Sequence, residues 1–164
     1  MKRVAAAALL FGALTTGARA GYDKTKWGMT LAQVEKLYPG GGEAEQQGET
    51  SYTVLAPVAG VPGLVTFLFD EKNGLHEVAV VFPQQGAKFD PKTDAYAPLA
   101  AADATRVREL ALQDLRRRYG PPAIQGEGAD TPLGWATKDG DLVLLKTARD
   151  GPDRFTVSIS FRKA

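Results

Sequence analysis

The chain carries a single histidine, His76, so any chemistry that needs an imidazole depends on this residue. Catalytic triads, metal-binding histidine pairs and histidine acid/base couples would all require it. A small hydrolase or lyase could pair His76 with Glu77 or Asp70, which are nearby in the sequence. The alternative is structural, because His76 begins an apolar strand and would share one face of it with Val78, Val80 and Phe82. The lack of a partner motif favours an imidazole at the edge of the core.

Other reactive side chains are sparse. The chain has no cysteine, which excludes a cysteine nucleophile, a thiolate metal site and a lipid-modified cysteine. Its serines lack the Gly-x-Ser-x-Gly turn of serine hydrolases. Carboxylate pairs such as Asp139 with Asp141 fall in expected turns, where Asp binds nearby backbone. The glycines at 40–42 follow a helix and precede no Gly-Lys-Ser/Thr, so they are no phosphate cradle. We expect no catalytic residue, no metal site and no cofactor.

Three consecutive arginines, Arg116, Arg117 and Arg118, fall in the last turn of an expected helix. Positive charge there complements the helix dipole, and Asp114 and Glu109 lie close by, which favours a solvated face that neutralises itself. An acidic partner or an anionic lipid headgroup is the alternative. The arginines are therefore candidate partner-binding residues.

Two aromatic residues, Phe89 and Tyr96, lie in residues 84–102, a segment without periodicity. Structureless segments of this length are uncommon unless they are functional or flexible. We expect this segment to be a linker or a long surface loop. Phe89 and Tyr96 join the candidates for partner binding.

The elements that would position these side chains follow the same order in both halves of the chain. Thr30 can cap a first helix with Gln33 reaching back to it in a capping box, and Pro39 ends the helical pattern. Three strands follow, at residues 52–55, 64–69 and 75–82, and the last two are joined by an Asn-Gly turn. The second half repeats helix, then three strands, at residues 103–119, 133–137, 142–147 and 155–162.

This order predicts an α+β fold of duplicated units, each a helix with a three-stranded antiparallel sheet. The first unit would span residues 21–83 and the second residues 103–164. Few residues are identical between the halves, so the repeat is one of element order and could be coincidence.

Apolar residues occupy most consecutive positions in residues 64–69, 78–82 and 142–145. A strand with one face in water should alternate, as residues 155–162 do. Both faces of these strands therefore need cover. Either the other half or residues 84–102 supply that cover within the chain, or a partner protein does.

Residues 1–20 have the features of an export signal. Two basic residues open the segment, residues 4–14 form an apolar run, and Ala18 and Ala20 are small residues of the kind that signal peptidases read. The run is too short to span a membrane, which takes about 20 residues. A retained anchor is the alternative. We expect cleavage before Gly21 and a periplasmic or secreted protein with no membrane span and no lipid anchor.

The composition and net charge of the chain argue against one class of partner, nucleic acid. The 164 residues are 44% hydrophobic with a formal charge of +1, which is typical of a globular protein. Without residues 1–20 the chain keeps 17 basic and 19 acidic residues. A charge so close to zero, with no basic stripe, argues against nucleic acid.

Residues 27–40, Trp-Gly-Met-Thr-Leu-Ala-Gln-Val-Glu-Lys-Leu-Tyr-Pro-Gly, resemble the Gly-Met-Thr-x-x-Gln-Val segment of the BamE/SmpA-like family. These are small bacterial envelope proteins with helices packed on a three-stranded antiparallel sheet. The element order is also similar to the two-repeat architecture of β-lactamase-inhibitory proteins. The chain departs from the first family in lacking its lipidated cysteine. The resemblance implies a non-catalytic envelope module that works by protein contact.

Together these observations predict an exported, non-catalytic envelope protein that binds another envelope protein or serves in assembly. The first alternative is a small-ligand carrier or inhibitor with an apolar groove. A small hydrolase that uses His76 is a second alternative.

Overall fold

The computed structural model describes residues 22–46, 48–72, 74–86, 96–125 and 131–163. Two helices and eight strands make up the described chain. In chain order they are α1 (Leu31–Leu37), β1 (Gly42–Gln46), β2 (Glu49–Val58), β3 (Val61–Asp70), β4 (Gly74–Val81), β5 (Leu99–Ala100), α2 (Ala101–Tyr119), β6 (Leu133–Ala136), β7 (Leu142–Arg149) and β8 (Arg154–Arg162).

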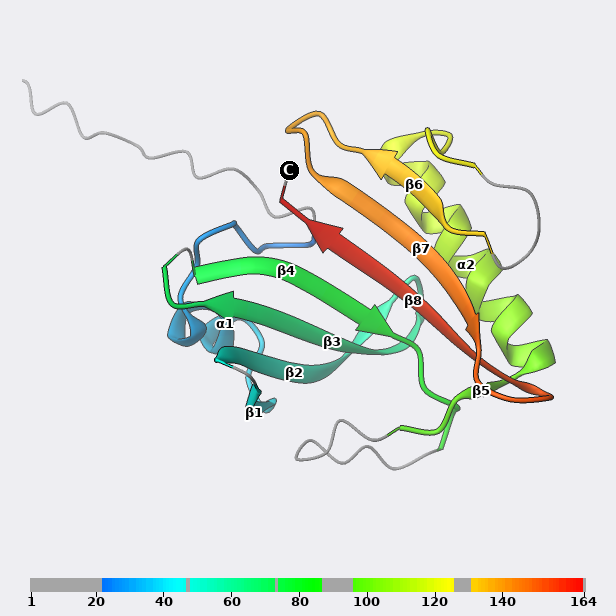
Figure 1. Cartoon of the computed structure of the whole chain (residues 1–164), viewed down its shortest axis with the longest axis horizontal. Helices are drawn as coiled ribbons and strands as arrows, with labels where there is room; N and C mark the ends of the chain where they lie inside the picture. Colours follow the sequence, from blue (N-terminus) through cyan, green and yellow to red (C-terminus); the bar gives the residue numbers. More distant parts are fainter. Residues whose placement is uncertain (1–21, 47, 73, 87–95, 126–130, 164) are drawn as a thin grey trace, which may run out of the picture.

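All the strands belong to one antiparallel sheet (Figure 1). The order across the sheet is β1-β2-β3-β4-β8-β7-β6, and the short strand β5 pairs with one end of β8. The central contact joins β4 to β8, with Val78 opposite Phe161 and Val80 opposite Ile159. One strand from each half of the chain therefore forms the middle of the sheet.

The predicted fold class, duplicated units of a helix with three strands, is wrong. Residues 21–83 and 103–164 contribute to one continuous sheet, because β4 and β8 hydrogen-bond to each other. Each of these strands would be an apolar edge in a separate unit, and unpaired backbone at such an edge favours pairing with another strand. Pairing β4 with β8 satisfies both edges within the chain.

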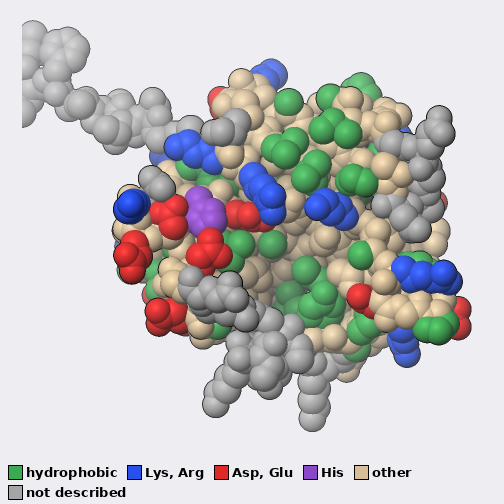
Figure 2. Space-filling model, viewed as in Figure 1, with side chains coloured by type: hydrophobic (Ala, Val, Ile, Leu, Met, Phe, Trp, Pro, Cys, Tyr) green, Lys and Arg blue, Asp and Glu red, His purple; other side chains and the backbone are tan. Residues whose placement is uncertain are grey.

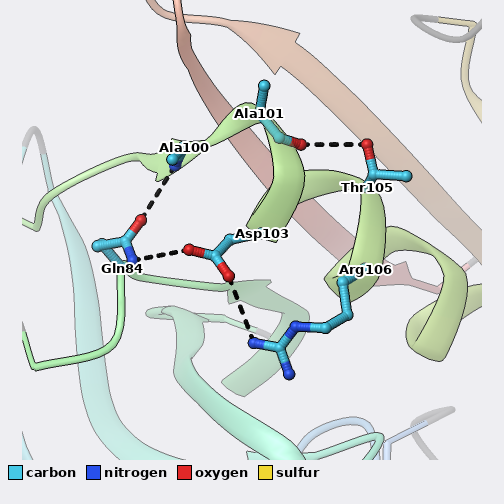
Figure 3. A network of polar contacts seen from close by, with 6 residues as sticks. All are labelled: Gln84, Ala100, Ala101, Asp103, Thr105 and Arg106. Carbon is cyan, nitrogen blue, oxygen red and sulfur yellow. Dashed lines mark hydrogen bonds and ion pairs between the residues drawn. The ribbon is translucent and has the colours of Figure 1, made fainter.

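The connection between β4 and α2 includes part of the segment predicted to be a linker. The described portion of residues 84–102 contains β5 and the start of α2, which begins at Ala101. Gln84 holds the two ends together, because its side chain accepts a hydrogen bond from the Ala100 backbone and donates one to Asp103 (Figure 3). Arg106 Nη2 lies 3.5 Å from Oδ1 of the same aspartate. Ala100 itself provides no side-chain cap, so this network is what ties the helix N-terminus to residue 84.

Both helices lie on the same face of the sheet (Figure 1). Helix α2 buries Val107, Ala111 and Leu115 at helical spacing. On β8, Val157, Ile159 and Phe161 are buried in the same core cluster, together with alternate residues of the neighbouring strands. One face of β8 therefore packs under α2, and its other face carries the polar residues of the alternating pattern.

An aromatic cluster fills the core near α1. Its centre is Phe67 of β3, whose ring centroid lies 5.0 Å from that of Tyr38 and 6.0 Å from that of Tyr22. The Tyr52 hydroxyl donates to the Tyr38 carbonyl at 2.6 Å and accepts from the Gly41 amide at 2.8 Å. The end of α1 is thus held to β2 through one phenol.

The predicted capping box at the start of α1 is confirmed. Thr30 accepts a hydrogen bond from the Gln33 amide, and the Gln33 side chain accepts one from the Thr30 amide at 2.9 Å. Two backbone donors that the helix cannot satisfy internally are thereby bonded.

The hairpin between β3 and β4 is also confirmed, and it requires a glycine at position 74. Gly74 has φ +66°, and a Cβ there would lie 2.8 Å from the carbonyl oxygens of Gly28 and Met29. The close approach exists because Leu75 donates to Met29 and accepts from Gly28, both at 2.9 Å. Residues before α1 are thereby fixed to the start of β4.

Candidate functional site

Outward-pointing side chains form the face of the sheet opposite the helices, which we call the open face. Cross-strand pairing arranges them in three rows across β2, β3, β4, β8 and β7. The rows are Leu55, Leu64, Val81, Ser158 and Lys146; Thr53, Thr66, Ala79, Ser160 and Leu144; and Ser51, Leu68, Glu77, Arg162 and Leu142.

Most of the open face is uncharged. Ala79, Val81 and Leu144 are half-buried, and Leu55 is 60% exposed. Leu64 is buried but does not belong to the core cluster on the helix side. Because both helices lie on the other face, neither of the described helices packs here. Figure 2 shows this side of the molecule, with apolar side chains across the face and acidic ones gathered at one end.

The open face explains where the consecutive apolar residues of the sequence lie. In residues 78–82 and 142–145, alternate positions enter the core and the others face outward. The core-facing set includes Val80 and Val143, which are fully buried, and the outward set includes Val81 and Leu142, which remain half-buried. Within the described chain, no helix covers the outward set.

Charged residues lie at the end of the open face where β4 begins. His76 Nε2 lies 3.3 Å from Glu49 Oε1, and Arg162 Nε lies 3.0 Å from Glu77 Oε1. Glu77 and Arg162 are direct cross-strand neighbours on β4 and β8. Opposite charges at such positions attract each other, so this pair also ties the two halves of the chain together.

The pairing differs from that needed by the hydrolase hypothesis. His76 contacts Glu49 of β2, while Glu77 pairs with Arg162 and Asp70 accepts from the Lys72 amide. Sequence reasoning missed Glu49, because only the β2–β3–β4 register brings residues 49 and 76 together. Among the residues that the structure describes, no group of three or more His, Cys, Asp or Glu side chains could hold a metal ion.

Two of the three predicted arginines meet at one carboxylate. Arg117 Nη2 donates to Asp114 Oδ1, and Arg118 Nε contacts Asp114 Oδ2 at 2.7 Å. The aspartate is nearly buried, whereas the Arg117 and Arg118 side chains are 78% and 43% exposed. The predicted self-neutralising arrangement near Asp114 is therefore present on this part of the helix.

A cleft of about 570 Å³ lies between this flank of α2 and the turn that joins β2 to β3. Helix residues Gln113, Arg117 and Arg118 line one side, and turn residues Ala59 and Gly60 line the other. Arg116 is exposed and is not among the lining residues. Sequence reasoning found the arginines but missed the cleft, because the β2–β3 turn is more than 50 residues away in the chain.

A smaller cavity of about 320 Å³ lies on the other side of Arg118. It is bounded by Tyr119 and by the turn at residues 137–139 between β6 and β7. Burial raises the pKa of the Tyr119 phenol, and the neighbouring Arg118 charge opposes that rise. Arg118 therefore separates two hollows at the C-terminal end of α2.

Two tyrosines near α1 also have perturbed phenols. Burial raises the pKa of Tyr22 to about 12, with a smaller contribution from Asp23 and an opposing one from Arg118. Burial raises the pKa of Tyr38 further, helped by the hydrogen bond that its hydroxyl donates to Asp23 at 2.7 Å. Both phenols stay protonated at neutral pH, both rings pack in the aromatic cluster, and the Tyr38 hydroxyl also donates to Asp23.

The remaining predicted partner-binding residues are not brought together with the arginines by any described contact. Tyr96 is half-buried just before β5. Phe89 lies outside the described residues, as do residues 1–20, the expected export signal. These expectations stay predictions.

No protein-family model, no curated protein and no solved structure matches the chain. The resemblance of residues 27–40 to the BamE/SmpA-like family therefore stays a prediction too. In the described part of the chain, neither helix has the length and apolar character needed to cross a membrane.

Proposed function

We propose that this protein is an exported, non-catalytic module that binds another envelope or secreted protein through the open face. The observation that carries the proposal is the position of both helices on one side of the sheet, which leaves the outward side chains of β4, β7 and β8 without a helix over them. Large sheets usually bury an apolar face against another layer. A partner protein would supply that layer.

The chemistry of the open face suits protein contact. Apolar side chains such as Leu55, Val81 and Leu144 are interleaved with the hydroxyls of Ser158 and Ser160. Charged groups lie toward the end where β4 begins. Protein interfaces commonly have an apolar centre, a few hydrogen-bonding groups and a charged rim. The charged end would set the orientation of the partner more than its affinity.

Export rests on residues 1–20, whose basic start, apolar run and small residues before Gly21 are typical of a cleaved signal. This pattern supports a periplasmic or extracellular location for the protein. The partner would then be a protein of the same compartment.

The non-catalytic part of the proposal rests on the pairing around His76. The imidazole contacts Glu49 on the open sheet surface, and it lines neither the 570 Å³ cleft nor the 320 Å³ cavity. An acid/base pair needs a substrate held beside it. Hydrolysis that disappears in His76→Ala would contradict this part of the proposal.

The test places a photo-crosslinking amino acid at Ser160, in the middle of the open face, and at Glu109, an exposed position on α2. Each variant is exposed to an envelope extract of the source organism, and crosslinked proteins are identified by mass spectrometry. We expect Ser160 to crosslink one partner that Glu109 does not. The partner is then purified, and its Kd is measured for the wild type and for Ala79→Glu, which introduces a charge beside Ser160.

We expect Ala79→Glu to weaken binding at least tenfold while the circular dichroism spectrum is retained. Glu109→Gln is the matched control and should leave the Kd unchanged. Equal crosslinking from both positions, or an unchanged Kd in folded Ala79→Glu, would show that the open face is not the binding surface.

A further inference from the structure

The cleft between α2 and the β2–β3 turn has an arrangement of charges suited to a ligand. Asp114 uses one carboxylate oxygen for Arg117 and the other for Arg118, so both guanidinium groups are held at the edge of the cleft. A guanidinium carries five N–H donors, and the contact with Asp114 occupies only part of each set. The other donors are available to an acceptor that enters the cleft.

We infer that this cleft binds a small organic molecule through a single carboxylate. Arginine donors match the planar geometry of a carboxylate and often bind both of its oxygens at once. Asp114 would act as a positioning residue that holds the two arginines before the ligand arrives. Preorganised donors lose less conformational entropy on binding.

The charge balance favours a monoanion. Two arginines and Asp114 give the cluster a net charge of +1, and among the described lining residues Asp114 carries the one carboxylate. One ligand carboxylate neutralises this cluster. A second negative charge would be repelled by Asp114 and by the negative C-terminal end of the α2 dipole.

The volume and the other lining residues indicate that the ligand has a body beyond its carboxylate. Small-molecule sites usually enclose about 300 to 1,000 Å³, and the 570 Å³ of this cleft lies in that range. Leu110 and Pro57 offer apolar contacts, and Gln113 offers an amide. An apolar chain or ring on the ligand would contact the first two residues.

This inference is independent of the proposed function. The cleft lies on the helix side of the sheet, between α2 and the β2–β3 turn, whereas the protein-binding proposal concerns the open face. Loss of one activity would therefore leave the other measurable.

The test is an NMR titration of the protein lacking residues 1–20 with three matched probes: 4-phenylbutyrate, the neutral 4-phenylbutanamide and the dianionic 3-phenylpropyl phosphate. We expect 4-phenylbutyrate to bind at least tenfold more tightly than either of the others. The amide shifts should centre on residues 57–60 and 110–118. A free short-chain acid and the C-terminal carboxylate of a protein share this chemistry. A tripeptide that ends in phenylalanine, compared with the same tripeptide carrying a C-terminal amide, distinguishes the two sources.

Variants within the arginine run supply the matched control. Arg117→Gln and Arg118→Gln should each raise the Kd for 4-phenylbutyrate at least tenfold. Arg116→Gln removes the same charge from the same helix turn but does not line the cleft, so its Kd should stay within twofold. Gln113→Trp fills the cleft without changing its charge and should also weaken binding at least tenfold.

Three results would overturn the inference. One is equal affinity for the acid and its amide, and another is tighter binding of the phosphate than of the acid. The third is an equal loss in Arg116→Gln and Arg117→Gln, because that would mean that only the overall positive charge of the helix end matters. If Arg118→Gln fails to fold, Arg117→Gln and Gln113→Trp decide the question, since both positions are exposed.

Discussion

The two faces of the sheet use different side chains on the same strands. On β8, Val157, Ile159 and Phe161 point into the core, while Thr156, Ser158 and Ser160 point outward. Strand β4 also alternates, with Val78 and Val80 pointing inward and Ala79 and Val81 pointing outward, but its outward residues here are apolar. Polarity separates the faces of β8, but residues 78–81 of β4 are apolar on both faces.

Size separates the faces more clearly than polarity does. The core face carries Phe67, Phe82, Phe161 and Trp135, all nearly or fully buried. The centre of the open face carries Ala79 and Ser160, which leave a flatter surface. Large rings are needed where a sheet must fill the space beneath a helix. A flat face of mixed polarity suits a second surface laid upon it.

The largest expected effect distinguishes adjacent residues on the two faces. Phe161→Ala should lower the free energy of unfolding by about 4 kcal/mol, because it removes a buried ring and leaves a cavity. Ser160→Ala, one residue away on the open face, should change it by less than about 0.5 kcal/mol. Urea denaturation of both variants measures the difference. Similar losses at the two positions would mean that the open face is packed as tightly as the core.

A second effect concerns the phenols under the core face. The folded-state pKa of Tyr22 is about 12, against an ordinary value of 10, so the unfolded chain releases its phenol proton first as the pH rises. The contribution is complete below pH 10 and is lost between pH 10 and 12, at about 1.4 kcal/mol per pH unit. Tyr22→Phe should remove this part of the alkaline loss in urea denaturation at pH 8, 10 and 11.

The remaining alkaline loss in Tyr22→Phe should come from Tyr38 and Tyr119, whose pKa values are also raised. Identical pH slopes for the wild type and Tyr22→Phe would contradict the assignment. The open face has no such buried phenol in its three rows, so variants there should keep the full alkaline dependence.

The smallest effect belongs to the ion pair on the open face. The Arg162 side chain is 54% exposed and the Glu77 side chain 17%, so solvent still screens this cross-strand pair and its coupling should be about 0.2 to 1 kcal/mol. A double-mutant cycle with Glu77→Gln and Arg162→Gln, measured by urea denaturation, gives this value. Salt at about 1 M should reduce the coupling, because solvent-exposed charges are screened. A coupling above about 2 kcal/mol would mean that the pair is shielded from water.

Local sequence signals predicted local structure well. Thr30 and Gln33 form the expected capping box, and the β3–β4 and β6–β7 hairpins form where turn residues join apolar runs. In each case the interacting residues lie within a few positions of each other, so their types and spacing carry the information.

The errors arose where backbone pairing acts over long distances. Strand β1 has no apolar alternation, since Glu43 and Glu45 flank Ala44, and the sequence pattern predicts no strand there. Pairing with β2 makes it a strand. The contact of β4 with β8 joins residues about 80 positions apart. No pattern inside either half indicates which strand the other half will meet, and this choice decided the fold class.

The candidate sites show the same difference between local contacts, which the sequence predicted, and long-range contacts, which it did not. The Asp114 link to Arg117 and Arg118 follows from helical spacing at three and four residues, and sequence reasoning placed these charges together. The β2–β3 turn that completes the cleft, and the Glu49 carboxylate beside His76, come from distant strands. Only the register of the sheet places them.

The place of β8 between β4 and β7 has a kinetic consequence. The hairpins formed by β2, β3 and β4 can assemble early, but their outermost strand keeps an unpaired apolar edge until β8, the last strand in chain order, closes against it. Distant pairings of this kind form slowly, since the intervening loop must lose entropy first. A chain that has made only β1 to β4 is therefore the species most exposed to aggregation, and a chaperone that shields the β4 edge would act at this step.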